Sequence, residues 1–221
     1  MSLKELFAPH DMTEGDPWRR ITEFAVPMLL GNIAQQLYNT ADSIIVGKFV
    51  GDNALSAVGS ASPILNMLLA LFVGISTGAG IVVSQCFGAK DRDGLSRGIG
   101  NCISLTFLAT IVIMIVGPII TRPMLNLLDT PDSIIDWCTS YLNIYFLGII
   151  GFFFYNMLSG ILRGLGDSVS ALGFLLLAAA LNVVLDLVFV AKFGMGVPGV
   201  ALATVLAQVF AAGWNLLQLI R

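Results

Sequence analysis

Charge is scarce in this sequence. Of its 221 residues, 11% are charged, whereas 57% are hydrophobic. Soluble globular domains carry about 25% charged residues, so the composition argues against a water-soluble globule and favours a helical membrane protein with several spans. The formal net charge of -3 comes without the basic clusters that nucleic-acid binding requires. We therefore expect no nucleic-acid partner.

Cysteine and histidine are also scarce. The three cysteines, Cys86, Cys102 and Cys138, show no spacing typical of a metal site or a redox pair. We expect them to be small buried residues that pack as apolar groups. The one histidine, His10, lies in a polar N-terminal stretch, so neither residue type predicts a cofactor.

Long apolar segments, by contrast, occupy most of the chain. Each is close to or above the roughly 20 apolar residues that cross a bilayer as a helix. We predict an all-α membrane protein, with residues 1–20 as a cytoplasmic N-terminal tail and residues 21–221 as a bundle of six transmembrane helices. No signal peptide is expected, because the first 16 residues lack an apolar core. The predicted spans are Ile21–Val46, Ala54–Phe87, Gly98–Ile120, Ile134–Leu162, Ser170–Ala191 and Val200–Ile220.

The basic residues predict the orientation of these spans. If the N-terminus is cytoplasmic, eight of the eleven basic residues fall on the cytoplasmic side, where Lys and Arg are enriched in membrane proteins. The three on the other side are Lys48, Arg122 and Lys192. We therefore expect a multi-pass protein of the cell membrane with both termini in the cytoplasm.

The first span carries a polar stripe. Asn32, Gln35, Asn39 and Asp42 step by three, four and three residues, which keeps their side chains on one face of a helix. A carboxylate inside a membrane is costly, and its default interpretation is functional. Pro27 lies in the same span, where it permits a bend or marks the first turns of the helix.

The depth of the polar residues in the membrane predicts a polar cluster between several spans. Asp42, Asp186, Asn182, Thr204 and Tyr141 fall at similar heights when the spans alternate in direction. Two neighbouring carboxylates cannot both ionise cheaply, so the pair could hold a proton, or a sodium ion with oxygens from Asn182 and Thr204. The alternative is that both aspartates only form hydrogen bonds between helices.

Five runs of this sequence resemble the multidrug and toxic compound extrusion (MATE) transporters, specifically their prokaryotic branch. The resemblance implies a cation-coupled antiporter, driven by sodium or protons, that exports amphipathic or cationic small molecules. It implies no cofactor other than the coupling ion. The runs are PMLLGNIAQQLYNTADSIIVG (Pro27–Gly47), ALSAVG (Ala54–Gly59), VVSQCFGAKD (Val82–Asp91), SGILRGLGD (Ser159–Asp167) and LNVVLD (Leu181–Asp186).

The resemblance also implies roles for single residues. Asp42 and Asp186 match the aspartates tied to ion coupling, and the first-helix proline that matches Pro27 is associated with bending. Asn182 and Thr204 match the neutral neighbours of the aspartates. Tyr38, Tyr141 and Asn156 match cavity positions, for which ordinary helix packing is the alternative. The polar stripe adds Gln35 and Asn39 as candidate substrate-cavity residues.

The chain departs from the family in length. MATE transporters have twelve spans in two six-helix lobes, so this sequence resembles the N-terminal lobe. Two explanations stay open: the sequence is a piece of a longer protein, or two copies pair as a homodimer to supply the second lobe. The expected partners are small organic substrates, the lipid bilayer and this second lobe.

Three other functions compete with export. An intramembrane aspartyl protease also needs two aspartates, and Gly164–Asp167 fits a Gly-x-Gly-Asp pattern, but helix N-capping explains Asp167. We expect no enzyme activity. A lipid-linked saccharide flippase of related fold would favour a basic cavity, which the spans lack. A membrane assembly subunit that transports nothing is the third alternative.

Overall fold

A computed structural model describes residues 16–220. Over these residues the chain folds into seven α-helices and one π-helical segment, without a strand. The prediction of an all-α protein is therefore confirmed. His10, most of the predicted 1–20 tail and Arg221 lie outside the described residues. The elements are α2 (Pro17–Phe49), α3 (Asp52–Gly88), α4 (Arg92–Leu127), α5 (Asp132–Leu147), α6 (Ile149–Gly164), α7 (Ser168–Asp186), η1 (Leu187–Lys192) and α8 (Gly196–Ile220).

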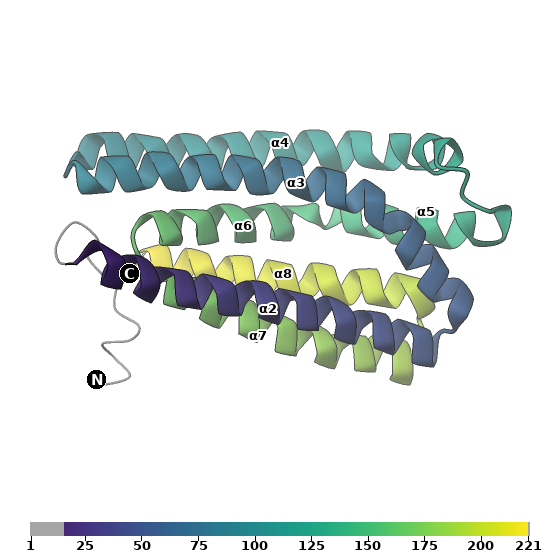
Figure 1. Ribbon diagram of the computed structural model, residues 1–221. Helices are drawn as coiled ribbons and strands as arrows, with labels where there is room; N and C mark the ends of the chain where they lie inside the picture. Colours follow the sequence, from purple (N-terminus) through teal and green to yellow (C-terminus); the bar gives the residue numbers. More distant parts are fainter. Residues whose placement is uncertain (1–15, 221) are drawn as a thin grey trace.

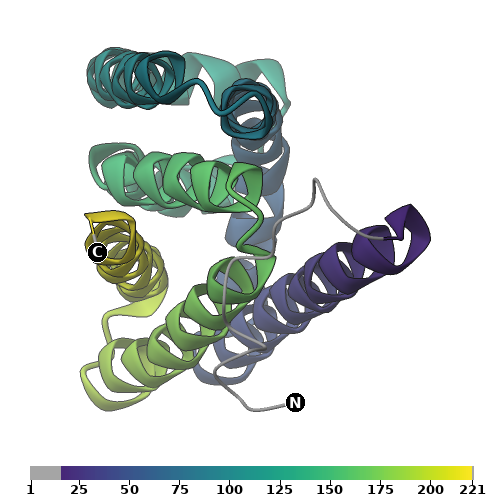
Figure 2. The ribbon, with the colours of Figure 1, turned by 90° about the vertical axis from the view of Figure 1, so that its left-hand side faces the viewer.

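These elements form long rods that alternate in direction (Figure 1). α5 and α6 together make one rod, bent by 52° at Gly148, and α7 continues into η1. The start of α2 and the end of α8 lie at the same end of the bundle (Figure 1). Viewed from that end, the rods follow an open arc, with α3 and α4 at one side and α2 and α7 at the other (Figure 2).

Most of the predicted spans are confirmed as helices of membrane-crossing character. α3, α4, α8 and the continuous α7–η1 stretch are long and apolar enough to cross a membrane, and the bent α5–α6 pair adds a fifth span. α2 has the length but not the apolar composition, because its polar stripe lowers the mean hydropathy. The chain is a multi-pass membrane protein.

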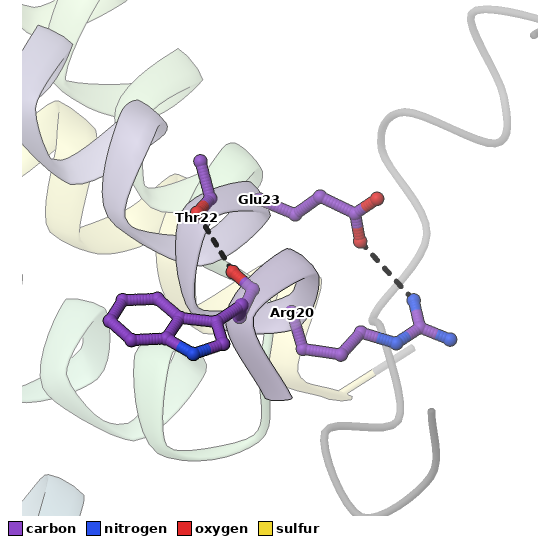
Figure 3. A network of polar contacts seen from close by, with 4 residues as sticks. Arg20, Thr22 and Glu23 are labelled. Carbon is purple, nitrogen blue, oxygen red and sulfur yellow. Dashed lines mark hydrogen bonds and ion pairs between the residues drawn. The ribbon is translucent and has the colours of Figure 1, made fainter. Parts of the chain in front are cut away.

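The first turns of α2 are held by local polar contacts (Figure 3). The Asp16 carboxylate accepts a hydrogen bond from the Trp18 amide at 3.2 Å and caps the helix. Thr22 Oγ1 donates to the Trp18 carbonyl at 2.8 Å, and Arg20 pairs with Glu23 at 3.3 Å. Trp18 itself is 79% exposed, which suits the aromatic belt at a membrane interface.

Small residues let α3 and α6 approach closely. A Cβ on Gly160 would lie 2.7 Å from the carbonyl oxygen of Ser76, and one on Gly164 would lie 2.6 Å from that of Gly80. Ser76 Oγ also donates to the Asn156 carbonyl at 2.5 Å. Such contacts between backbones are typical of helix packing in lipid. They fix α6, which carries part of the candidate site.

The cysteine prediction is confirmed in part. Cys138 is fully buried, and its thiol donates to the Ala57 carbonyl at 3.3 Å. Cys86 and Cys102 are free thiols of intermediate exposure. Cys102 packs partly buried against a core cluster that includes Val83 and Leu158, so full burial is confirmed for Cys138 and not for the other two.

Candidate functional site

A cavity of about 970 Å³ lies along the inner faces of α2 and α3. Its floor comes from α5, α6, α7 and α8. Among the described residues that line it, Asp42 and Arg163 carry formal charge. The other polar side chains in the lining are Asn32, Gln35, Tyr38, Asn39, Ser43, Ser62, Asn66, Ser76, Thr77, Ser84, Tyr141, Tyr145, Tyr155, Asn156, Ser168, Thr204 and Gln208.

The structure brings Asp42 of α2 and Asp186 of α7 together. Their carboxyl groups lie within reach of a mutual side-chain hydrogen bond. Such a bond needs a proton on one of the two, because an ionised carboxylate only accepts. Without this proton, both oxygens of Asp186 and Oδ1 of Asp42 are buried and have no hydrogen-bond partner among residues 16–220. Asp42 lines the cavity, whereas Asp186 is 0% exposed and lies behind the lining.

Asn182 and Thr204 join this pair. Asn182 Nδ2 donates to Thr204 Oγ1 at 3.3 Å, and Thr204 in turn donates to the Val200 carbonyl at 3.1 Å. Asn182 is 0% exposed, and its Oδ1 has no hydrogen-bond partner. The cluster therefore offers several oxygens that await a proton or a cation.

Tyrosines surround the same end of the cavity. Tyr38 of α2 lies within hydrogen-bonding reach of Thr204, and Tyr141 of α5 is buried in the lining. The ring of Tyr145 lies 6.1 Å from that of Tyr141. Sequence reasoning missed Tyr145, although it follows Tyr141 by one helical turn and so shares its face.

The remaining predicted residues also line the cavity. Gln35 Nε2 donates to Asn39 Oδ1 at 3.5 Å along α2. Asn156 Nδ2 donates to the Phe152 carbonyl within α6 at 2.8 Å, so part of its amide is engaged locally. Pro27 is in the lining and well inside α2, which begins at Pro17. Its placement in the first turns of a helix is therefore wrong, since the helix starts before the predicted Ile21.

The polar face of α8 went unnoticed in the sequence. Gln208 follows Thr204 by one turn and lines the cavity, with a buried Oε1 that has no hydrogen-bond partner. Asn215, further along the same face, donates to Ser159 Oγ at 3.0 Å. Helical spacing from Thr204 would have found Gln208. A search for apolar runs overlooks such residues, because single polar groups barely change the hydropathy of a span.

Comparison with known proteins decides the family. The MatE family profile matches residues 27–188, which is more than half of the chain. The chain belongs to the MatE family. The probable multidrug resistance protein YpnP of Bacillus subtilis (strain 168) is 34% identical over 212 residues, which cover 96% of this chain and 48% of that protein.

Solved MatE structures have the same fold. A MOP superfamily transporter from Pyrococcus furiosus matches with a TM-score of 0.88 at 29% identity, covering 94% of this chain and 46% of that one. A multidrug resistance MATE family transporter in an outward-facing conformation matches with a TM-score of 0.88, covering 95% and 46%. The resemblance seen in the sequence is confirmed. The chain spans about half the length of the relatives it matches.

Two of the competing functions, the aspartyl protease and the saccharide flippase, lose support. Asp167 Oδ1 accepts from the Ser170 amide at 2.9 Å and caps α7, as its position predicted. Asp167 and Asp186 lie at opposite ends of α7, so they do not form a pair of protease aspartates. The matched relatives are named as probable multidrug resistance proteins and as a multidrug export protein, which does not favour the flippase alternative.

Proposed function

We propose that this chain forms one lobe of a cation-coupled exporter of amphipathic or cationic small molecules. The observation that carries the proposal is the carboxyl pair of Asp42 and Asp186 beside the cavity, with buried oxygens that lack partners. Buried polar groups are nearly always satisfied. Unsatisfied acceptors next to a cavity therefore favour a site whose occupant comes and goes.

Either a proton or a sodium ion fits this donor set. A single proton shared by the two carboxyl groups supplies the missing hydrogen bond. A sodium ion is a hard cation that prefers oxygen ligands, and Asp42, Asp186, Asn182 Oδ1 and the Thr204 hydroxyl are the oxygens that would hold it. Both occupants cancel the charge that otherwise lies inside the membrane.

The same end of the cavity suits an organic cation. Asp42 contributes the carboxylate that lines the cavity, and Tyr38, Tyr141 and Tyr145 contribute aromatic rings. An organic cation gains both charge pairing and contact with aromatic faces. Because the coupling ion and the organic cation draw on the same carboxylate, binding of one weakens binding of the other. This competition is the simplest form of antiport.

Transport also needs a second lobe. Alternating access in transporters of repeated architecture moves one bundle against another, and this chain matches about half the length of its relatives. In our proposal the second lobe comes from the remainder of a longer protein or from a second copy of this chain. We further propose that both termini lie on the cytoplasmic side, which the distribution of basic residues favours.

Efflux of ethidium from proteoliposomes tests the proposal. Residues 1–221 are reconstituted, and a sodium gradient and a pH gradient are imposed separately. Asp42→Asn and Asp186→Asn are compared with Asp136→Asn, a matched control whose exposed carboxylate pairs with Arg122 at 3.3 Å. If two copies of this chain complete the transporter, we expect efflux driven by one gradient, lost in the first two variants and kept in the control. If the second lobe is the remainder of a longer protein, the same variants are compared in that protein. Gradient-driven efflux that survives both variants would contradict the proposed coupling site.

A further inference from the structure

The two ends of the cavity differ in charge. Asp42 lines one end, near Thr204 of α8, and Arg163 lines the other. Asn215, which lies about 16 Å along α8 from Thr204 at 1.5 Å per residue, bonds to Ser159, one turn before Arg163 on α6. The carboxylate and the guanidinium are therefore too far apart to pair. Each is available to a ligand.

Arg163 has no carboxylate partner among residues 16–220. Arg20 pairs with Glu23 and Arg122 pairs with Asp136, and neither of these carboxylates lines the cavity. The nearest acidic residue in sequence, Asp167, is buried and accepts from the Ser170 amide. Arg163 lies in the last turn of α6, at the end of the bundle that our proposal places toward the cytoplasm. Its guanidinium lines the cavity without a carboxylate partner in the described part of the chain, so it is available to an anion.

Neighbouring groups supply further donors. The Tyr155 hydroxyl lies in the same lining, within electrostatic range of Arg163 and within hydrogen-bonding reach of Ser159. Ser159 Oγ also accepts from Asn215 Nδ2 at 3.0 Å. The Tyr155 hydroxyl therefore lies near Ser159, which Asn215 holds in place. This hydroxyl and the planar guanidinium then form a donor set at this end of the cavity.

We propose that Arg163 and Tyr155 form an anion-binding subsite that takes the phosphate or carboxylate group of an amphipathic molecule. Guanidinium groups match these planar or tetrahedral anions in geometry and bind them by charge-assisted hydrogen bonds. The apolar surface between the two ends accommodates the rest of the molecule. The subsite extends the proposed function, which rests on the Asp42 end, to anionic and zwitterionic amphipaths.

Arg163 also lies in the last turn of α6, where any positive charge stabilises the helix end. A purely structural role would therefore be met by lysine as well as by arginine, and it would not discriminate between ligands. A measurement of direct binding of small anions distinguishes a role in stabilising the helix end from a role in binding a ligand. Because it needs no gradient, it also fails or succeeds independently of ion-coupled export.

The probe is hexyl phosphate, with hexyltrimethylammonium as its cationic counterpart. Isothermal titration calorimetry is performed on the full chain in micelles of dodecyl maltoside, which carries no phosphate or carboxylate group. We expect Arg163→Gln to weaken hexyl phosphate binding about ten-fold, the loss of one charge-assisted hydrogen bond, and to leave hexyltrimethylammonium binding unchanged. Tyr155→Phe weakens hexyl phosphate binding less. Arg122→Gln, a charge removed outside the cavity, changes neither affinity.

Two results would overturn the subsite: no binding of hexyl phosphate by the unmodified chain, or equal binding by Arg163→Gln. If Arg163→Gln does not fold, the test uses Arg163→Lys and Tyr155→Phe instead. Undiminished affinity of both variants for hexyl phosphate would overturn the proposed subsite. Phosphatidylglycerol added to the micelles identifies the source of the anion. Competition of this lipid with hexyl phosphate, lost in Arg163→Gln, assigns a lipid headgroup. Absence of competition, with the ten-fold effect intact, assigns a soluble amphipath.

Discussion

The side-chain amide of Asn182 donates a hydrogen bond of 3.3 Å to the hydroxyl of Thr204, which joins α7 to α8 at the closed side of the cavity. The bond orients the amide so that its nitrogen is engaged and its oxygen is left without a partner. That oxygen belongs to the same buried cluster as the two carboxyl groups of Asp42 and Asp186. The hydrogen bond from Asn182 to Thr204 therefore positions the Asn182 oxygen for the proposed ion site.

Replacement of Thr204 by valine tests this contact. Thr204→Val keeps the shape of the side chain but leaves the Asn182 amide unsatisfied, so we expect the free energy of unfolding to fall by about 1–3 kcal/mol. Stabilisation by the coupling ion should fall as well. Thr110→Val is the matched control, because the Thr110 hydroxyl bonds only to Thr106 of its own helix. Thermal unfolding in detergent, with and without the ion, measures both effects. If the coupling ion stabilises Thr204→Val as much as the unmodified protein, Thr204 is not part of the ion site.

The close crossing of α3 and α6 gives a second prediction. Gly160→Ala places a methyl group against the Ser76 carbonyl, and overpacking of this kind typically costs about 1–3 kcal/mol. Gly173→Ala on α7 is the control, because nothing lies within 4 Å of a Cβ there. We expect Gly160→Ala to lower the temperature of unfolding in detergent and Gly173→Ala to leave it equal or higher. Equal unfolding temperatures in the two variants would mean that the helices separate easily.

Pro27 gives a third prediction. It interrupts the hydrogen-bond ladder in the interior of α2, so Pro27→Ala should stiffen the helix. Spin labels at Ile21 and Ile44, both exposed, flank the proline once the native cysteines are replaced. We expect the label distance to change on ion binding in the unmodified helix and to stay fixed in Pro27→Ala. Pro118→Ala, in the interior of α4, serves as control. If Pro27→Ala shows the same ion-dependent change in label distance, bending of α2 does not depend on this proline.

Much of the fold followed from apolar run length alone. The runs predicted the helices well because each is bounded by glycine, proline or aspartate, as in Asp91 and Asp167, which cap α4 and α7. The break at Gly148 escaped prediction, since an uninterrupted apolar run gives no sign of a 52° bend. The bend depends on packing against other helices, which periodicity does not report.

The site was predictable to the extent that burial of charge is costly. That cost singled out Asp42 and Asp186 and required them to meet, and the structure places them together. Tyr145 and Arg163 were missed as cavity residues, because aromatic and basic residues near helix ends usually have packing or interfacial roles. Gln208, in the middle of α8, was missed because one polar residue barely changes the hydropathy of a span. Only the three-dimensional path of the cavity shows that they line it.

Ion-dependent stability tests the central claim most directly. The unfolding temperature of the full chain is measured against sodium concentration at fixed pH, and against pH without sodium, for the unmodified protein, Asp186→Asn and Asp136→Asn. Because a ligand that binds only the folded state stabilises it, we predict a rise with sodium or with proton concentration in the unmodified protein and in Asp136→Asn, and none in Asp186→Asn. An equal rise in all three proteins would contradict the assignment of the carboxyl pair as the ion site.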